Sequence, residues 1–537
     1  MKFRTIITML LAAALIFSLA ACAKTEPTES TAAATDAPTE ATEETEAIAG
    51  DVIELTLVGD GVVCDSDAVY AANDMIYYEA GHDESYGEGS DDEAHTAAEA
   101  AEHTVVHITA PGVYRVTGEL KGQLFIDLGE DAKKDENARV TLILDNASIA
   151  CAVAPAILFY RVYECGDKET FTLTPDLTNA GATVVLRGEN TVDGSHVAKI
   201  YKEGTTDKLY KFDGAFYSKQ SLRIEGDGVL NITADNEGLD TELHLQIDGG
   251  EINIFSQDDG VNTNEDGISV TTINGGTINI SGGNGSEGDG IDSNGALVVN
   301  GGTLYASANP RTGDGGIDAD LGIYLNGGTV IATGSRNDEI SADSKQVLMD
   351  LTFADSVKKG AALVLLDGET QVFSFTAKRD FSALVVSAPE LRLDVPYRLK
   401  VDGALQQHSG KGTLGPVSSA GPGAPGSGTL PDPDDGPPPA LPEGSDSAPP
   451  MLTPDGNESP FAGIELPPET FASSDGERPE PPSGDQPEPP SGERPTPPDG
   501  ENPGGERPDA GSEEVSDTFT VTAENHSFFN VTAANGG

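Results

Sequence analysis

The chain has 537 residues, and its 90 Asp and Glu residues against 31 Lys and Arg residues give a formal net charge of −59. This charge excludes nucleic-acid binding through a basic surface, because phosphate contacts require clustered Lys and Arg. It also argues against direct attraction to anionic lipids or polymers unless a cation mediates the contact. With 63 Gly, 34 Pro and no Trp, the composition indicates an all-β, turn-rich chain with disordered segments attached.

The N-terminus has the pattern of an exported lipoprotein. Lys2 and Arg4 precede an apolar run over residues 6–19, which is shorter than the roughly 20 residues of a membrane span and is typical of a secretory signal. The run ends in Leu-Ala-Ala-Cys, which is similar to a bacterial lipobox and predicts cleavage before Cys22 and lipid attachment to its sulfur. An ordinary signal peptide with a coincidental cysteine stays open. We therefore expect a signal peptide over residues 1–21 and a protein held at the extracellular face of the membrane by its lipid alone.

Two further segments lack the apolar periodicity of folded structure. Residues 22–50 are rich in Thr, Ala and Glu and are expected to form a solvated tether. Residues 416–516 hold most of the prolines and many acidic residues but no Lys, so we expect an extended, disordered segment. Residues 517–537 alternate as a strand does and form a candidate C-terminal strand.

Between these segments, residues 51–415 consist almost wholly of short β-type runs separated by Gly, Asn and Asp. We expect an N-terminal β cap over 51–110, a repetitive region over 111–346 and a C-terminal β region over 347–415. An acidic loop is predicted at residues 82–103, with His82, His95 and His103 as solvated side chains rather than metal ligands.

The chain holds three further cysteines. Cys151 and Cys165 lie close in the sequence, and a disulfide between them or two free thiols both remain open. Cys64 is expected to be a small core residue. No Cys-x-x-Cys motif or Cys/His cluster suggests zinc.

The repetitive region carries Gly-Gly turns at a fixed spacing. The strings QIDGGEINI, TINGGTINI, VVNGGTLYA and YLNGGTVIA place their first Gly at positions 249, 275, 301 and 327, which are 26 residues apart. A fixed period in the twenties is typical of a solenoid, in which each coil buries its apolar side by stacking on its neighbours. Each coil holds alternating runs without helical periodicity, so we predict an all-β, parallel β-helix with about 22–30 residues per coil.

A second, acidic motif recurs once per coil. Its copies begin at Asp213, Glu237, Asp259, Asp289, Gly315 and Asp338, and most continue with Gly and an apolar residue. If the apolar residue points inward, strand alternation makes the first residue after it point outward, the second inward and the third outward. The outward pairs are then Asp240/Glu242, Asn262/Asn264, Asp292/Asn294, Asp318/Asp320 and Ser341/Asp343.

These outward pairs predict a cation site. Stacked strands lie about 4.8 Å apart, so the side chains form columns in which isolated carboxylates repel and must either raise their pKa values or bind a cation. Oxygen ligands suit calcium better than a transition metal. The candidate ligands are Asp240, Asp258, Asp259, Asn262, Asp289, Asp292, Asp314, Asp318 and Asp320. The alternative, in which Asp and Asn only form turns and Asn ladders stabilise the stack, stays open.

The order of motifs resembles a known family. The succession ITAPGVYRVTGEL, VTLILDNASI, FDGAFYSKQSLRIEGDGVLNI and the repeated turns over residues 51–415 is similar to the carbohydrate-binding, polysaccharide-lyase-like β-helix lipoproteins. The resemblance implies a right-handed parallel β-helix, calcium on the acidic ridge, and binding of cellulose and acidic pectic polymers without established cleavage. The copy at Asp338-Glu339-Ile340 lacks the motif's Gly, which puts a site in the last coil in doubt.

We therefore expect a monomeric, non-catalytic protein that binds polysaccharide through calcium. An anionic protein binds a uronate polymer only if divalent cations lie between two sets of carboxylates. The best outward aromatic residues for stacking on a sugar are Tyr305 and Tyr324, with Tyr217 less certain, and Arg311 and Arg336 are candidates for contacting a sugar carboxylate.

Two alternatives stay open. A calcium-dependent polysaccharide lyase needs a basic side chain beside the metal, and Arg311, Arg336 and Lys219 are the candidates. A surface adhesin or spacer would use calcium for stability only.

Overall fold

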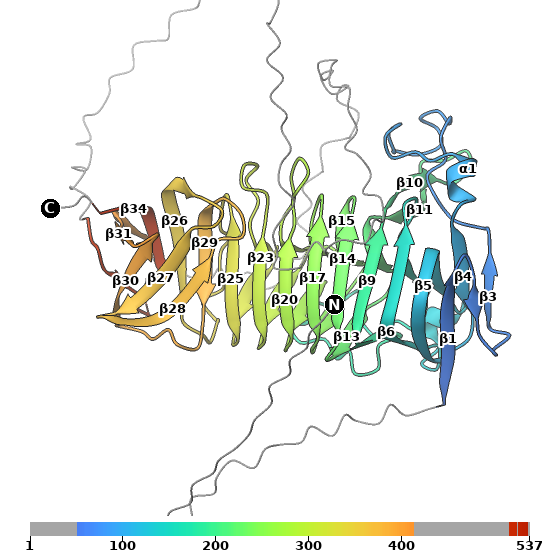
Figure 1. Ribbon diagram of the computed structural model, residues 1–537, viewed down its shortest axis with the longest axis horizontal. Helices are drawn as coiled ribbons and strands as arrows, with labels where there is room; N and C mark the ends of the chain where they lie inside the picture. The colour runs from blue at the N-terminus through green and yellow to red at the C-terminus, as the bar shows by residue number, and fades with distance from the viewer. Residues whose placement is uncertain (1–50, 413–514, 524, 535–537) are drawn as a thin grey trace, which may run out of the picture. The chain divides into compact units, whose positions relative to one another are not determined.

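The computed structural model describes residues 51–412, 515–523 and 525–534. The predicted signal peptide with Cys22, the tether and nearly all of the Pro-rich segment lie outside these described residues. The described part is nearly all β, as the composition predicts (Figure 1). None of its helices has the length and apolar character that crossing a membrane requires.

The N-terminal strands pair with the first long strand of the chain. Strand β1 (Val52–Gly59) runs parallel to β5 (Gly112–Asp127) and antiparallel to β2 (Val62–Val63). Strand β3 (Val69–Ala72) runs antiparallel to β4 (Thr104–Ile108), which is parallel to β5. Between β3 and β4, residues 73–103 form an insertion that holds the short helix α1 (Ala97–Ala100). A capping box between Thr96 and Glu99 begins this helix, so the predicted acidic loop is partly helical.

The central region consists of three rows of parallel strands. The ridge row, as we call it, contains β4, β5, β7 (Ile157–Arg161), β12 (Gly214–Ser218), β15 (Glu237–Thr241), β18 (Val261–Thr263) and β21 (Ile291–Ser293). The second row contains β6 (Val140–Cys151), β8 (Ala182–Arg187), β13 (Leu222–Gly226), β16 (Leu245–Ile247), β19 (Val270–Ile273), β22 (Ala296–Val299) and β24 (Gly322–Leu325). The third row contains β9 (Glu189–Gly194), β14 (Val229–Ala234), β17 (Glu251–Ser256), β20 (Thr277–Ser281), β23 (Thr303–Ser307) and β25 (Thr329–Gly334).

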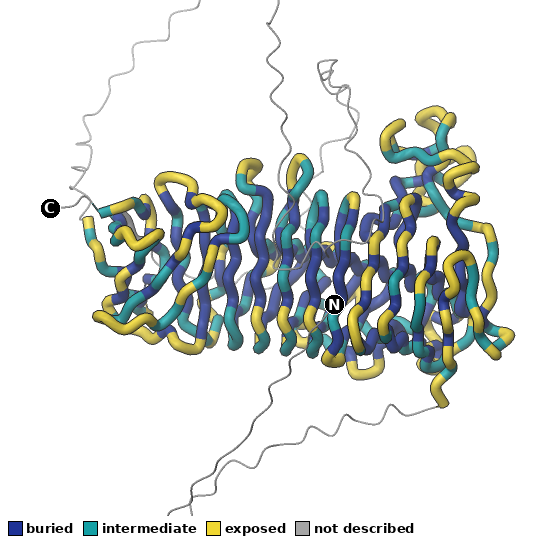
Figure 2. Tube along the Cα trace, viewed as in Figure 1, coloured by how far each residue is buried: buried dark blue, intermediate teal, exposed yellow. Residues whose placement is uncertain are grey.

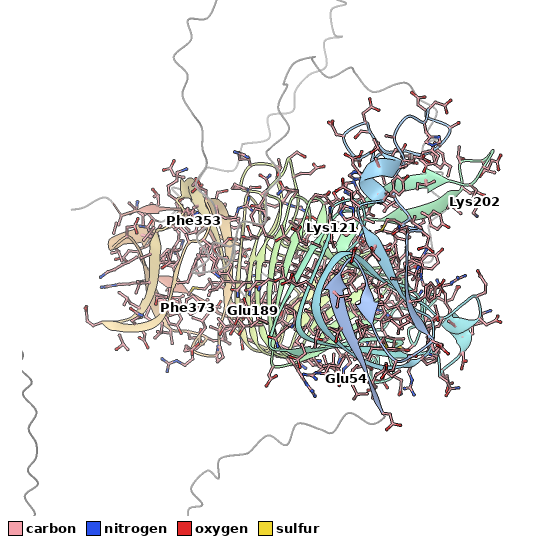
Figure 3. All side chains as sticks on the ribbon, turned by 45° about the vertical axis from the view of Figure 1, so that its right-hand side comes forward. Glu54, Lys121, Glu189, Lys202, Phe353 and Phe373 are labelled. Carbon is pink, nitrogen blue, oxygen red and sulfur yellow. The ribbon has the colours of Figure 1, made fainter. Side chains whose placement is uncertain are left out.

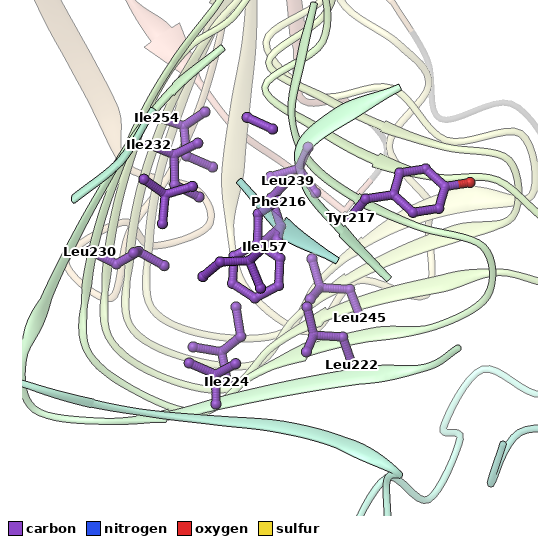
Figure 4. Close-up of a cluster of buried hydrophobic side chains, with 14 of the residues drawn as sticks. Ile157, Phe216, Tyr217, Leu222, Ile224, Leu230, Ile232, Leu239, Leu245 and Ile254 are labelled. Atoms are coloured by element: carbon purple, nitrogen blue, oxygen red, sulfur yellow. The ribbon is translucent and has the colours of Figure 1, made fainter. Parts of the chain in front are cut away.

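The rows enclose a continuous apolar interior. In the third row, Ile252 pairs with Ile278, Ile278 with Leu304, and Leu304 with Val330, so each partner lies 26 residues further along the chain. All four side chains are fully buried. Figure 4 shows interior residues of several strands facing one another, and Figure 2 shows buried residues along all the rows. Because apolar side chains of successive strands stack on one another, the apolar face of each strand is removed from water.

The Gly-Gly turns hold neighbouring chains too close for side chains. The second glycine of these turns has a positive φ, 85° at Gly276 and 76° at Gly302. A Cβ on Gly276 would lie 2.6 Å from the Gly250 carbonyl oxygen. Only glycine meets both demands, which explains why the pair recurs.

Asparagine ladders connect successive strands and turns. On the third row, Asn253 Nδ2 donates to Asn231 Oδ1 at 3.0 Å, and Asn279 Nδ2 donates to Asn253 Oδ1 at 2.9 Å. We call these three residues the strand ladder. The turn ladder (Asp248, Asn274, Asn300 and Asn326) repeats the arrangement, with each amide donating to the preceding side chain at 2.8–3.0 Å.

The hairpin of β10 (Val197–Tyr201) and β11 (Lys208–Phe212) lies beside the insertion, and the 3₁₀ turn η1 (Ala132–Lys134) lies between β5 and β6. All three cysteines in the described residues are free, so Cys151 and Cys165 form no disulfide. Cys151 is buried, and Cys64 is half-buried against the core. His103 is also buried, and its Nδ1 lies 3.0 Å from the Glu99 carbonyl, so the expectation of a solvated side chain is wrong for this residue.

A C-terminal β region follows the rows. Its strands are β26 (Leu348–Val357), β27 (Ala362–Asp367), β28 (Thr370–Thr376), β29 (Phe381–Ser387), β30 (Pro396–Val401), β31 (Ala404–Gln407), β32 (Gly410–Gly412), β33 (Phe519–Thr520) and β34 (Ser527–Ala533). Strand β29 pairs antiparallel with both β25 and β26, and β34 runs parallel to β26. This region has its own buried cluster, which includes Tyr305 and Ile331 from the third row.

Candidate functional site

Strand alternation on the ridge row separates apolar from polar side chains. Leu239, Val261 and Ile291 are at most 1% exposed and point into the interior, as the motif predicts. The following residues pair across the row in the order Tyr217, Asp240, Asn262 and Asp292. Figure 4 shows this alternation on β12, where Phe216 lies among the core residues and Tyr217 points away from them.

The glycines of the acidic motif are required by close packing. A Cβ on Gly260 would lie 2.1 Å from Ile280 Cγ2 and 2.5 Å from the Gly290 carbonyl oxygen. The chain therefore turns tightly against its neighbours at each copy. This packing brings the acidic side chains before and after each glycine close to those of the next copy.

Three carboxylates gather at the start of the repeated motif. Asp213, Glu237 and Asp240, which we call the carboxylate cluster, each offer an oxygen, and these atoms lie within 4.8 Å of one another. All three residues are buried, with exposed fractions of 9%, 7% and 0%. In the described residues this is the one group of three or more His, Cys, Asp or Glu side chains with that geometry.

Several oxygens of the cluster have no hydrogen-bond partner. Asn262 Nδ2 donates to Glu237 Oε1 at 3.1 Å, and Asn264 Nδ2 donates to Asp240 Oδ1 at 2.6 Å. Glu237 Oε2, Asp240 Oδ2 and Asn262 Oδ1 are buried and unpaired. Buried polar atoms are nearly always satisfied in proteins, so three orphaned acceptors side by side point to a missing electrophilic partner.

The charges of the cluster are also unbalanced. Burial and the neighbouring Asp213 carboxylate raise the pKa of Glu237 to about 8, and burial and Glu237 raise the pKa of Asp240 well above its ordinary value. Lys211 Nζ contacts Asp213 Oδ2 at 2.7 Å and neutralises one of the three carboxylates. The other two carboxyl groups have no cationic partner in the described residues, so without a metal they hold protons at neutral pH, and one divalent cation would balance their charge if it displaced those protons.

The carboxylates of the adjoining turns mostly accept backbone hydrogen bonds. Asp259 accepts from the Asp289 N–H at 2.7 Å, and Asp289 accepts from the Gly315 N–H at 2.6 Å. Asp314 accepts from the Gly288 N–H at 2.9 Å. These three residues therefore have a turn-forming role, as the alternative interpretation expects. Burial nevertheless raises the pKa of Asp259 to about 9 and that of Asp289 to about 7.

Asp258 does not share this pattern of side-chain bonding to the next turn. Burial raises its pKa, and so do Glu287, Asp314 and Asp213. Asp258 is therefore close enough to Asp213 of the carboxylate cluster and to Asp314 of a later turn for their charges to act on it.

The far end of the ridge holds a cavity of about 450 Å³. It brings together Asp318, Asp320, Tyr324 and Arg336, four of the residues that the sequence singles out. Burial and neighbouring carboxylates raise the pKa of Asp318 to about 7 and that of Asp292 to about 6. Arg336 forms ion pairs with Asp318 and, at 3.6 Å, with Asp338.

Two of the three tyrosines predicted to point outward and stack on a sugar are buried in the structure. Tyr305 is only 5% exposed, because the C-terminal region covers it: Lys378 Nζ lies 4.3 Å from its ring centre and the Lys378 N–H donates to its hydroxyl. Tyr217 is 2% exposed and donates to Glu242 Oε1 at 2.8 Å. Neither offers a face to a sugar, whereas Tyr324 is half-buried and lines the cavity. Arg311 is exposed and lies outside that cavity.

Lys219 directly follows β12 of the ridge row, two residues beyond Tyr217. Its Nζ lies over the rings of Tyr160 and Phe212, at 5.3 and 6.0 Å. Burial lowers the pKa of Lys219, although the nearby Glu242 carboxylate raises it. This is the environment of an amine that loses its proton more readily than an exposed lysine does.

Asp213 and Glu237 were not among the predicted ligands. Both begin copies of the acidic motif, so the signal was present in the alignment of the copies. The candidate ligands come mainly from the outward positions and the later turns, which leave out the first residues of these two copies. Glu237 lies at the start of β15, the strand that also carries Asp240.

Comparison with known proteins identifies one family and one similar structure. The model of a family described as carbohydrate-binding domain-containing protein matches residues 102–376. A solved structure of the polysaccharide lyase-like protein from C. thermocellum, a gadolinium derivative, is 21% identical over 52% of this chain and 94% of that chain, with a TM-score of 0.30. That TM-score is too low to argue for a shared fold. No curated protein matches the chain.

Proposed function

Because the chain belongs to the carbohydrate-binding domain-containing protein family, we propose that it binds polysaccharide through calcium and does not cleave it. The observation that carries the proposal is the carboxylate cluster, whose buried oxygens lack partners. The polymers proposed are acidic, pectic-type glycans of plant cell walls, with cellulose as the weaker candidate.

The proposed scaffold is a right-handed parallel β-helix. It is supported by three rows of parallel strands, and among β12–β25 the paired residues lie 22–30 residues apart, such as Leu230 with Ile252 and Val261 with Ile291. Such a scaffold would repeat the same outward position from one coil to the next. The ridge would then present its oxygens at regular spacing to an extended polymer.

The donor set of the cluster fits calcium. Asp213, Glu237 and Asp240 provide carboxylates, and Asn262 provides an amide oxygen, all of them hard ligands that calcium prefers. Neither His nor Cys belongs to the group, so a transition metal is disfavoured. When bound, calcium would supply positive charge that a uronate carboxylate can share with the protein.

The cavity at the far end of the ridge supports the assignment of an acidic glycan. Tyr324 offers an aromatic surface, and Arg336 offers a guanidinium that a sugar carboxylate can contact with two hydrogen bonds. In the protein alone this guanidinium already contacts Asp318 and Asp338. A uronate would therefore compete with these side chains unless a cation binds them.

Lipid attachment at Cys22 would hold this monomeric protein at the extracellular face of the cell membrane, close to its polymer. The Leu-Ala-Ala-Cys ending of the apolar run supports this localisation. Metabolic labelling with a palmitate analogue, compared between the wild type and Cys22→Ser, tests it.

The direct test is retention of the protein on immobilised polygalacturonate, in calcium and in EDTA. We expect retention in calcium only, and Asp240→Asn should lose it. Asp227→Asn is the matched control, because it removes an exposed carboxylate outside the cluster. Retention in EDTA, or equal retention of both variants, would contradict the proposal. Stabilisation by calcium without retention would favour a surface adhesin or spacer.

A calcium-dependent polysaccharide lyase is a second candidate, favoured by the position of Lys219. Its amine lies near Glu242, which is two residues beyond Asp240 of the carboxylate cluster, and burial lowers its pKa. A lysine in this state is suited to taking the proton beside a uronate carboxyl group. Absorbance at 235 nm during incubation with polygalacturonate measures the unsaturated product. Product formed by the wild type and abolished in Lys219→Met would establish the lyase.

A further inference from the structure

A second cavity lies away from the ridge carboxylates, between the insertion and the β10–β11 hairpin. Its volume is about 720 Å³, and we call it the insertion cavity. One wall comes from residues 75–86 and the other from residues 200–210. Figure 3 shows this hairpin projecting from the rows, with Lys202 near its tip. Residues 75–86 precede the segment 102–376 that the family model matches, so this wall lies outside the matched segment.

Hydrogen bonds fix the two walls relative to each other. The Tyr201 N–H donates to the Tyr86 carbonyl at 2.8 Å, and the Glu88 N–H donates to the Lys199 carbonyl at 2.9 Å. The Glu88 carboxylate accepts from Lys199 Nζ at 2.6 Å and from the Tyr201 hydroxyl at 2.8 Å. Between them, Gly87 allows the chains to meet, since a Cβ there would lie 2.1 Å from the Lys199 carbonyl oxygen. The cavity is therefore preformed, which lowers the entropic cost of binding a ligand.

The lining has the composition of a sugar-binding surface. Four tyrosines, Tyr77, Tyr86, Tyr201 and Tyr210, line it together with apolar Met75, Ile76 and Leu209. Tyrosine offers an apolar face for stacking and a hydroxyl for hydrogen bonding. His82 stacks on Tyr86 with ring centres 4.0 Å apart, which holds the Tyr86 ring in place. Leu209 is 42% exposed, so the cavity opens to solvent.

The charges of the lining select the ligand. Glu79, Asp83 and Glu203 line the cavity, whereas none of its described lining residues is Lys or Arg. Carboxylates accept hydrogen bonds from sugar hydroxyls but repel uronate carboxylates. The ridge carboxylates also repel a uronate, but the carboxylate cluster there is suited to a divalent cation that would offset the repulsion. The three carboxylates that line the insertion cavity do not form such a cluster. An uncharged sugar fits this surface and an acidic sugar does not.

We propose that the insertion cavity is a second glycan site, which binds uncharged oligosaccharides without calcium. The proposal deepens the proposed function, since it rests on the family's carbohydrate binding for the class of ligand. It divides the protein into two sites of opposite selectivity. The ridge binds acidic polymer with calcium, and the insertion cavity binds neutral glycan without it.

The test is titration of the full chain with cellohexaose, mannohexaose and galactohexaose, followed by tyrosine fluorescence in calcium and in EDTA. At least one oligosaccharide should bind with the same Kd in both buffers. Tyr77→Ala and Tyr210→Ala should each raise that Kd roughly tenfold, because each removes one stacking face. Tyr70→Ala is the matched control, since this tyrosine is 46% exposed on β3 and does not line the cavity.

Retention on polygalacturonate in calcium, measured on the same variants, shows that they remain folded. As a check without mutation, the bound oligosaccharide should slow hydrogen exchange in residues 75–86 and 200–210. Binding of none of the three oligosaccharides, loss of binding in EDTA, or wild-type affinity in both cavity variants would overturn the assignment. Failure of the ridge proposal would instead appear as absence of calcium-dependent polygalacturonate retention in the wild type, whatever the neutral sugars do.

Discussion

Two groups of polar side chains lie across the stacked strands, and they differ in whether their hydrogen-bonding atoms have partners. In the strand ladder, Asn231, Asn253 and Asn279 are linked by hydrogen bonds of 2.9–3.0 Å, each amide donating to the one before it. In the carboxylate cluster, Glu237 and Asp240 are buried but keep unpaired oxygens. An amide both donates and accepts, whereas an ionised carboxylate only accepts. A column of amides therefore satisfies itself, and a column of carboxylates must take up either protons or a cation.

The largest expected effect comes from removing a charge from the cluster. Wild-type protein should gain about 2.7 kcal/mol of unfolding free energy at a calcium concentration 100 times the Kd, and Glu237→Gln should lose most of this gain. In EDTA at pH 9, above the pKa of Glu237, the same variant should be more stable than the wild type, because one repelling charge is gone. Urea unfolding in calcium and in EDTA measures both differences. An equal calcium response in the two proteins would refute the role assigned to Glu237.

The pH dependence of the calcium-free protein sharpens the comparison further. Burial raises the pKa of Asp292 to about 6, of Asp289 to about 7, of Glu237 to about 8 and of Asp259 to about 9. At these four groups the folded state binds more protons than the unfolded state above pH 4, so the stability that they contribute falls as pH rises from about 4 to 9. We expect Tm in EDTA to fall by several degrees between pH 5 and pH 9. Calcium should flatten the profile, and a profile unaffected by calcium would argue against cation binding by these groups.

Breaking the amide column should have a smaller effect that calcium does not change. Asn253→Ala removes the donor to Asn231 and the acceptor for Asn279, which should cost about 1–3 kcal/mol in unfolding free energy. Urea unfolding should give the same loss in calcium and in EDTA. A loss that calcium restores would mean that the strand ladder also responds to the cation.

The smallest effect concerns carboxylates that the protein neutralises with its own cation. His196 contacts Asp235 at 3.1 Å and Glu93 at 3.2 Å, and although burial lowers the pKa of His196, these ion pairs raise it to about 9. Since the folded pKa exceeds the ordinary value near 6.5, the stabilisation is complete below pH 6.5 and is lost as pH rises through 9. His196→Gln should therefore lower Tm by a few degrees at pH 6 and make little difference at pH 10. A constant difference across this range would exclude the charge as the cause.

The strand rows can be predicted from local patterns in the sequence: composition, the spacing of Gly-Gly turns and the alternation of apolar and polar residues. Composition predicts the all-β class, which the structure confirms. The strands that follow successive Gly-Gly turns pair with one another. The turns recur in the sequence because neighbouring turns touch, and at the contact, as at Gly276, only a glycine fits. Alternation also predicts which side of β15 and β18 Leu239 and Val261 occupy. These features depend on residues close in sequence or on one repeated contact.

The site depends on contacts that no periodicity reveals. Tyr305 has the alternation of an outward residue, but β28 and Lys378, more than seventy residues later, cover it. The carboxylate cluster combines the first residues of two adjacent copies, Asp213 and Glu237, with Asp240, and only the folded structure shows that their oxygens converge. The insertion cavity combines segments over a hundred residues apart. For Tyr305 and the insertion cavity, contacts with distant segments decide the outcome, and the spacing of residues along the chain does not encode them.

The antiparallel pairing of β29 with β25 limits how this protein associates with itself. A parallel row has a free edge at its end, and such an edge can pair with the same row of a second copy and extend into a filament. Here the edge of β25 is taken by a strand of the same chain, running in the opposite direction, and β26 continues from it. The length of the third row is therefore set by one polypeptide. The apparent molecular mass should then not rise with protein concentration through pairing at this edge.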